Sequence, residues 1–175
     1  MNQTYRLILK WLTYALVFAG LAVLQTGVMP LLTIAGVHPN LLALAPPMVA
    51  VLEGGVPGAM FGVVAGLCCD ALLPPFAAVH TIYFFLSGLL VGCLSEALLK
   101  KNFGTAALSA LASLTVLDVL LFALFFFIPR RAGFGAITQV LIPEVAFSAL
   151  FTPLVYLPLR WVWRRRWTEW EEGEP

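Results

Sequence analysis

Charged residues are scarce in this sequence. Only 11% of the 175 residues are Asp, Glu, Lys or Arg, and 61% are hydrophobic, whereas soluble domains carry about 25% charged residues. So few charges cannot cover the surface of a water-soluble domain, and the composition therefore predicts a membrane protein that crosses the bilayer several times. The formal net charge of +1 gives no sign of a nucleic-acid partner, and none is expected.

Recognisable catalytic and metal-binding patterns are also missing. The three cysteines, Cys68, Cys69 and Cys93, lie within apolar runs and two of them are adjacent, so neither a disulfide framework nor a metal-ligand spacing is expected. The sequence has no nucleophile elbow, no HExxH and no glycine-rich phosphate loop. His38 and His80 are expected at helix ends near the outer face. We therefore predict that the protein is not an enzyme and holds no cofactor or metal.

Long apolar runs dominate the chain. Residues 7–28, 76–99, 104–128 and 140–163 are each long enough to span a bilayer, since a crossing takes roughly 20 residues. The first run lacks a convincing signal-peptide cleavage site, so we expect a retained helix. Residues 39–73 are too long for one span and short for two. Glu53-Gly54-Gly55 divides them, and the first half contains Pro46 and Pro47.

The distribution of positive charge decides between one span and two. If residues 39–73 cross twice, eight of the ten Lys and Arg residues lie in the cytoplasm and only Arg130 and Arg131 lie outside; a single crossing leaves four inside and six outside. Because positive residues favour the cytoplasmic side, the sequence predicts an all-α integral membrane protein. We expect a bundle of six transmembrane helices, the second short and proline-interrupted, with both termini cytoplasmic. We expect residues 1–175 to form a single polytopic membrane domain, with residues 164–175 as a short cytoplasmic tail.

The segment GGVPGAMFGVVAGLCCDALL, residues 54–73, has a glycine at every fourth position. These glycines are Gly54, Gly58, Gly62 and Gly66, and the next step of four reaches Asp70. In lipid, helices associate by close packing, so small residues mark a contact face. We expect the last three glycines to contact another helix, either of the same protein or of a partner. Asp70 would secure the outer end of that contact through a backbone group, Arg130 or Arg131, or a partner.

Asp118 is the acidic residue predicted to lie deepest in the membrane. It is 14 residues from Gly104 and 10 from Ile128, near the middle of its run, where an acid costs about 2.5–3.5 kcal/mol on insertion scales. No lysine or arginine is expected at the same depth. We therefore expect a neutral side chain or one bonded to serine or threonine groups. It is either a satisfied polar contact inside the bundle or a relay or ligand group.

Three stretches of this chain resemble the rod shape-determining protein MreD family. They are LQTGVMP, HPNLLAL and GAMFGVVAGLCCDALL, which carry a late glutamine in the first helix, a proline before the second and a glycine-rich helix ending in G-L-x-x-D. Gln25, Pro39, Gly58, Gly62, Gly66 and Asp70 occupy these positions. The chain departs from the family pattern at Glu53, where a basic residue is common, and in PPFAAVH, which has alanines where a glycine commonly stands.

The resemblance implies a non-enzymatic component of the bacterial plasma membrane that acts in rod shape and lateral cell-wall elongation. Its expected partners are an MreC-like scaffold protein, the elongation glycosyltransferase and transpeptidase, and membrane lipid. The family fold is also similar to the substrate-binding subunits of energy-coupling-factor vitamin transporters, which supplies the alternative function. In that case Asp70, His38 and His80 would hold a vitamin-sized ligand.

Overall fold

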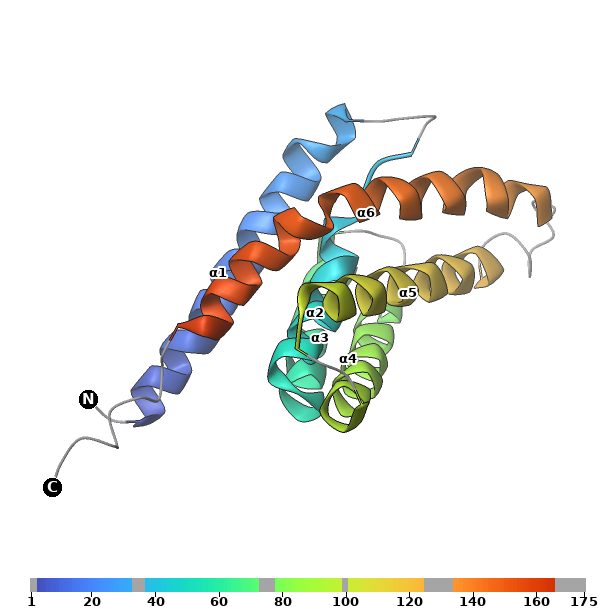
Figure 1. The fold of residues 1–175 in the computed structure, drawn as a ribbon. Coiled ribbons are helices and arrows are strands. Elements are labelled where there is room, and N and C mark those ends of the chain that lie inside the picture. The colour runs from blue at the N-terminus through green and yellow to red at the C-terminus, as the bar shows by residue number, and fades with distance from the viewer. Residues whose placement is uncertain (1–2, 33–36, 73–77, 99–100, 125–133, 166–175) are drawn as a thin grey trace, which may run out of the picture.

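The computed structural model describes residues 3–32, 37–72, 78–98, 101–124 and 134–165. These residues form six α-helices and a short 3-10 turn (Figure 1). The elements are α1 (Gln3–Gly27), η1 (Met29–Leu31), α2 (Leu41–Glu53), α3 (Gly55–Leu72), α4 (Val79–Leu98), α5 (Phe103–Phe122) and α6 (Phe134–Arg164). Five of these helices are long and apolar enough to cross a membrane, and α2 is shorter. The prediction of a six-helix membrane bundle is confirmed.

Helix α2 forms the centre of the bundle. Its residues 41–52 are all buried, and it packs against each of the other five helices. A helix that is hydrophobic all round is stable only when it is enclosed. Its 13 residues extend about 20 Å at the rise of an α-helix, less than the hydrocarbon thickness of about 30 Å. Because protein rather than lipid surrounds α2, this short length is tolerated.

The two prolines of α2 do not break it. The second helix is short and contains Pro46 and Pro47, as predicted, and it is continuous from Leu41 to Glu53. A proline has no N–H and leaves one carbonyl of the preceding turn without its helical partner. Neighbouring helices on every side hold α2 in shape despite this loss.

The helices of the first half of the chain run alternately up and down. Gln25, near the end of α1, hydrogen-bonds the start of α2, whereas Lys10, near the start of α1, pairs with Glu53 at the end of α2. Similarly, the end of α3 bonds the start of α4, and the start of α3 bonds Glu96 near the end of α4. The region 39–73 therefore crosses the bundle twice, as the charge distribution predicted.

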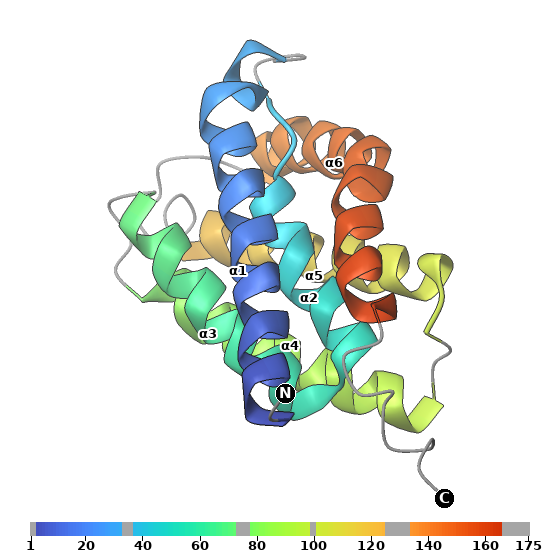
Figure 2. The same ribbon diagram turned by 90° about the vertical axis from the view of Figure 1, so that its left-hand side faces the viewer.

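Helix α6 is bent. Its 31 residues include Pro143, Pro153 and Pro158, and proline is the usual cause of a kink in a long helix. Figures 1 and 2 show the first half of α6 lying beside α5 and the second half turning to run along α1. The end of α6 and the start of α1 consequently lie at the same end of the bundle. That this end faces the cytoplasm stays a prediction.

The outside of the bundle is apolar and several polar side chains are inside it. Leu16 and Leu150 are each 72% exposed, whereas Ser148 and Thr152 are buried. An apolar exterior is what a lipid-facing surface requires. The arrangement is that of a multi-pass membrane protein.

Candidate functional site

The glycines of α3 make direct contact with the backbone of α4. A methyl group placed on Gly62 would overlap the carbonyl of Phe84, and one placed on Gly66 would overlap the backbone of Thr81. At Gly58, an added Cβ would lie 2.5 Å from the Cβ of Ala50 in α2 and 3.2 Å from the carbonyl oxygen of Gly88. The predicted contact face exists, and α4 of the same chain occupies most of it. A partner helix must therefore bind elsewhere.

Helix α4 supplies matching glycines that the sequence reasoning missed. A Cβ on Gly88 would lie 2.6 Å from the carbonyl oxygen of Gly58, and one on Gly92 would lie 2.5 Å from the backbone of Gly55. Gly88 and Gly92 are also four residues apart, so the same small-residue spacing could have identified α4 as the partner of α3. Gly54 has a different role: it ends α2 with φ of 104°, a conformation that favours glycine.

Asp70 binds the first turn of α4. Its carboxylate accepts hydrogen bonds from the backbone N–H groups of His80 (3.1 Å) and Thr81 (3.0 Å). It also lies 2.9 Å from His80 Nδ1 and accepts the Thr81 hydroxyl at 2.6 Å. The first N–H groups of a helix lack partners within it, and a carboxylate there also complements the helix dipole. A backbone group was one of the partners expected for Asp70, and the N–H groups of His80 and Thr81 fill this role. The other candidates within the chain, Arg130 and Arg131, lie outside the described residues.

Gln25 joins α1 to the entry of α2. Its side chain is 8% exposed, its Nε2 donates to the carbonyl of Pro39 at 3.0 Å, and its Oε1 accepts the N–H of Leu41 at 2.8 Å. One amide group thus satisfies an acceptor and a donor that would otherwise be buried without partners. Pro39, which cannot donate, leads directly into the helix cap at Asn40, whose side chain accepts the N–H of Ala43.

Asp118 lies near this same entry of α2. The α-helical part of α5 ends at Phe122, about one turn beyond Asp118. Residues 125–128 lie outside the described residues, so the expected place of Asp118 in the middle of a run from 104 to 128 stays a prediction. Its electrostatic neighbour is Glu144 of α6, which hydrogen-bonds the Asn40 side chain. Its Oδ2 atom is buried and has no hydrogen-bond partner among the described residues. The expected serine or threonine partner of that oxygen is therefore not found, and the proximity of Glu144 was not predicted.

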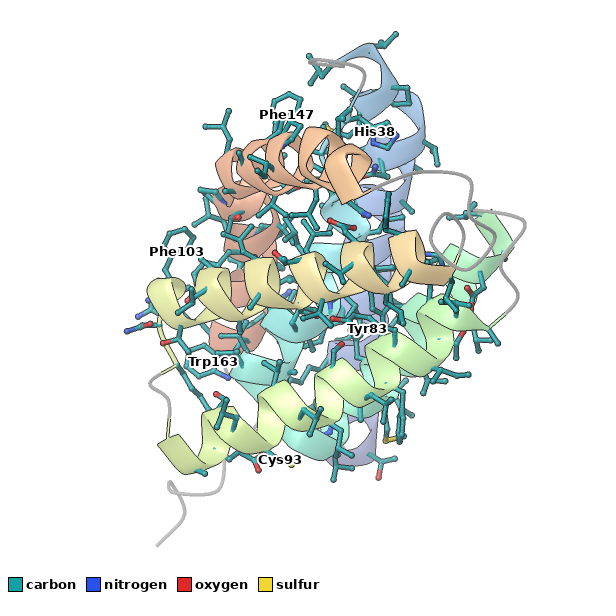
Figure 3. The ribbon with its side chains drawn as sticks, turned by 90° about the vertical axis from the view of Figure 1, so that its right-hand side faces the viewer. His38, Tyr83, Cys93, Phe103, Phe147 and Trp163 are labelled. Atoms are coloured by element: carbon teal, nitrogen blue, oxygen red, sulfur yellow. The ribbon has the colours of Figure 1, made fainter. Side chains whose placement is uncertain are left out.

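The three residues that would hold a vitamin in the transporter alternative belong to two different clusters. Asp70 and His80 bond each other at the α3–α4 contact. His38 interacts electrostatically with Glu144, beside the entry of α2. Figure 3 shows His38 close to the end of α1, away from Tyr83, which lies one turn after His80 on α4.

A second connection between α1 and α2 was not anticipated. Lys10 Nζ donates to Glu53 Oε2 at 2.6 Å, and the hydroxyl of the fully buried Tyr14 donates to Glu53 Oε1 at 2.7 Å. Glu53 stands where the family often has a basic residue, and Lys10 supplies the opposite charge from α1. An acid at the end of a helix is unfavourable beside the helix dipole, and these two donors offset that effect.

The polar groups around Gln25, Asp70 and Glu53 share one property: they hydrogen-bond helices of this chain to one another. Within the described residues, no group of three or more His, Cys, Asp and Glu side chains is arranged to hold a metal ion. Residues 5–162 match the sequence profile of a family described as rod shape-determining protein MreD. The chain belongs to the MreD family. Comparisons with curated proteins and with solved structures gave no significant match.

Membership in the MreD family implies a role in the determination of rod shape. The family match covers Gln25, Pro39, the α3 glycines and Asp70, so the motif positions on which the resemblance rested all lie within it. In this MreD-family chain, each of those positions contributes to a contact between helices.

Proposed function

We propose that this chain is a non-catalytic membrane scaffold of the machinery that elongates the lateral cell wall. It would act in the bacterial plasma membrane beside an MreC-like scaffold protein and the elongation glycosyltransferase and transpeptidase. The observation that carries the proposal is the family match over residues 5–162. It is supported by the use of Gln25 and Asp70 in helix–helix bonds rather than in an open polar site.

The apolar exterior supports association with other membrane proteins. Leu16 and Val23 of α1 are both more than 70% exposed, and Gly20 on the same helix has nothing within 4 Å of an added Cβ. Lipid or a transmembrane helix of a partner can cover such a surface. A compact bundle with short connections suits a scaffold that holds partner proteins together better than it suits an enzyme.

Complementation together with co-purification tests the proposal. The full chain, expressed in a rod-shaped bacterium depleted of its own family member, should restore rod shape and retain the scaffold protein and the elongation synthases after extraction from membranes. A Gln25→Leu variant at normal membrane abundance serves to ask whether helix α1 must be held on α2 for that retention. Full-length protein that neither restores shape nor retains these partners, but carries a vitamin-sized ligand, would overturn the proposal in favour of the transporter alternative.

A further inference from the structure

Arg160 is a partly buried cation without an acidic partner among the described residues. It lies on α6, one turn before the end of that helix, and its Cζ is 5.6 Å from the ring centroid of Tyr156. The Nε atom of Arg160 is buried and has no hydrogen-bond partner in the part of the chain that the structure describes. The ion pairs that join described residues are Lys10–Glu53 and Asp70–His80. Because arginine stays charged in proteins, this site has a positive charge that no acidic residue of the described part of the chain compensates.

Tyr156 adds a second unpaired donor at the same place. Its side chain is 1% exposed, yet its hydroxyl has no hydrogen-bond partner within the described ranges. The guanidinium of Arg160 stands over the ring whose edge carries this hydroxyl, so the two donors belong to one small region. A buried polar group left unsatisfied costs about 1–3 kcal/mol. Neither donor finds an acceptor among the described residues, so both are available to an acceptor that those residues do not supply.

The start of α5 makes this region more positive. The ring of Phe103, the first residue of α5, lies 5.1 Å from the ring of Tyr156, and the N-terminus of a helix carries a partial positive charge. Lys101 precedes it and donates to the carbonyl of Leu52 at 3.0 Å. Figure 3 shows Phe103 at the same end of the bundle as Trp163, close to the end of α6. The acceptor that fits this region is therefore an anion.

We propose that Arg160 and Tyr156 bind the phosphate of an anionic phospholipid headgroup beside the start of α5. Arginine matches the geometry of phosphate oxygens, and basic pockets between transmembrane helices are known sites for anionic headgroups. The neighbouring Trp161 is 58% exposed, and tryptophan gathers at the depth of lipid headgroups. A zwitterionic headgroup fits less well, because it also carries a cation of the same sign as Arg160. This inference does not depend on the role in cell-wall elongation.

Native mass spectrometry of the delipidated full-length protein tests the site, with phosphatidylglycerol and phosphatidylcholine added in turn. We expect phosphatidylglycerol to bind more tightly. Arg160→Gln should weaken its binding by about tenfold, the scale of a charge-assisted hydrogen bond. Tyr156→Phe keeps the buried ring and should weaken binding several-fold without lowering the melting temperature in detergent. Arg164→Gln removes an exposed charge one turn further along α6 and should change binding less than about twofold.

Three results would overturn the assignment. Equal binding of the two lipids would mean that the headgroup charge is not recognised. An equal loss from Arg164→Gln and Arg160→Gln would mean a general attraction of basic residues to anionic lipid. Displacement of phosphatidylglycerol by millimolar inorganic phosphate would mean that the site takes free phosphate rather than a headgroup. If Arg160→Gln does not fold, normal lipid binding by Tyr156→Phe alone is sufficient to reject the proposal.

Discussion

Gly62 of α3 lies against the carbonyl group of Phe84 in α4, with no room between them for a methyl group. Flanking contacts repeat this arrangement along both helices, where Gly58 meets Gly88 and Gly66 meets Thr81. Glycine lowers helix propensity by about 1 kcal/mol relative to alanine. Close packing between the two backbones offsets that loss, because in lipid it is a main source of helix association.

Gly62→Ile should therefore destabilise the bundle. The added side chain must push α4 away from α3 along the whole contact, and overpacking of a tight interior costs typically about 1–3 kcal/mol. We expect a lower melting temperature in detergent and lower abundance in the membrane. Gly20→Ala is the matched control, because Gly20 is exposed and no atom of the described residues lies within 4 Å of an added Cβ. It should be neutral or slightly stabilising; an abundant, stable Gly62→Ile protein would contradict this account.

Asp70 variants should lose stability in proportion to the hydrogen bonds they lose. Asp70→Asn keeps one acceptor oxygen but presents an NH2 group to donors of Thr81 or His80, whereas Asp70→Leu removes all four interactions. Removal of a helix cap costs about 0.5–2 kcal/mol, so the melting temperature should fall in the order wild type, Asn, Leu. Thr81→Val removes only the 2.6 Å hydroxyl bond and should have a smaller effect than Asp70→Leu. Equal stability of the Leu variant and wild type would show that Asp70 does not stabilise α4.

Features that depend on residues close together in the sequence could be predicted, whereas contacts between residues far apart in the sequence could not. The four-residue spacing of the α3 glycines could be recognised because it depends only on the geometry of one helix. Which helix packs against these glycines depends on the fold, and in the structure it is α4. Gln25 was identified through its position in the family motif, but its bonds to residues 39 and 41 require the fold. The depth of Asp118 in the membrane stays a prediction, because residues 125–128, which would complete its apolar run, lie outside the described residues. The proximity of Asp118 to Glu144 depends on how α5 packs against α6, which no sequence pattern predicts.

Gln25→Leu should loosen the attachment of α1 to α2. Leucine fills a similar volume but leaves the carbonyl of Pro39 and the N–H of Leu41 without their partners, at about 1–3 kcal/mol for each unsatisfied group. We expect a clear fall in melting temperature and faster hydrogen exchange at the start of α2. Thr26→Ala is the control, since the exposed Thr26, as far as the described residues go, bonds only carbonyls of its own helix. Similar exchange rates in the two variants would argue against a connecting role for Gln25.

The charge distribution predicts which face each connection occupies. Reporter fusions at Lys101 and Arg166 should report the cytoplasm, and a fusion at Arg131 should report the outside, because positive residues favour the cytoplasmic side. Arg131 and Arg166 lie outside the described residues, so the fusions add information that the fold does not contain. An external signal at Lys101 would contradict the predicted orientation of the whole bundle.

Asp118→Asn should leave folding and shape complementation intact. Asparagine has the size of aspartate, and the substitution removes an acid from beside Glu144. The buried Oδ2 of Asp118 has no hydrogen-bond partner among the described residues, so the substitution breaks no bond of that oxygen there. We expect a melting temperature equal to or slightly above that of wild type. Glu144→Gln is the companion variant, because glutamine can still hydrogen-bond Asn40; it should behave similarly. An Asp118→Asn protein that is abundant and stable but fails to restore rod shape would contradict a purely structural role. It would instead favour a proton-linked or ligand-binding function for the Asp118 carboxyl group, since loss of function without loss of fold requires that its charge or its proton be used.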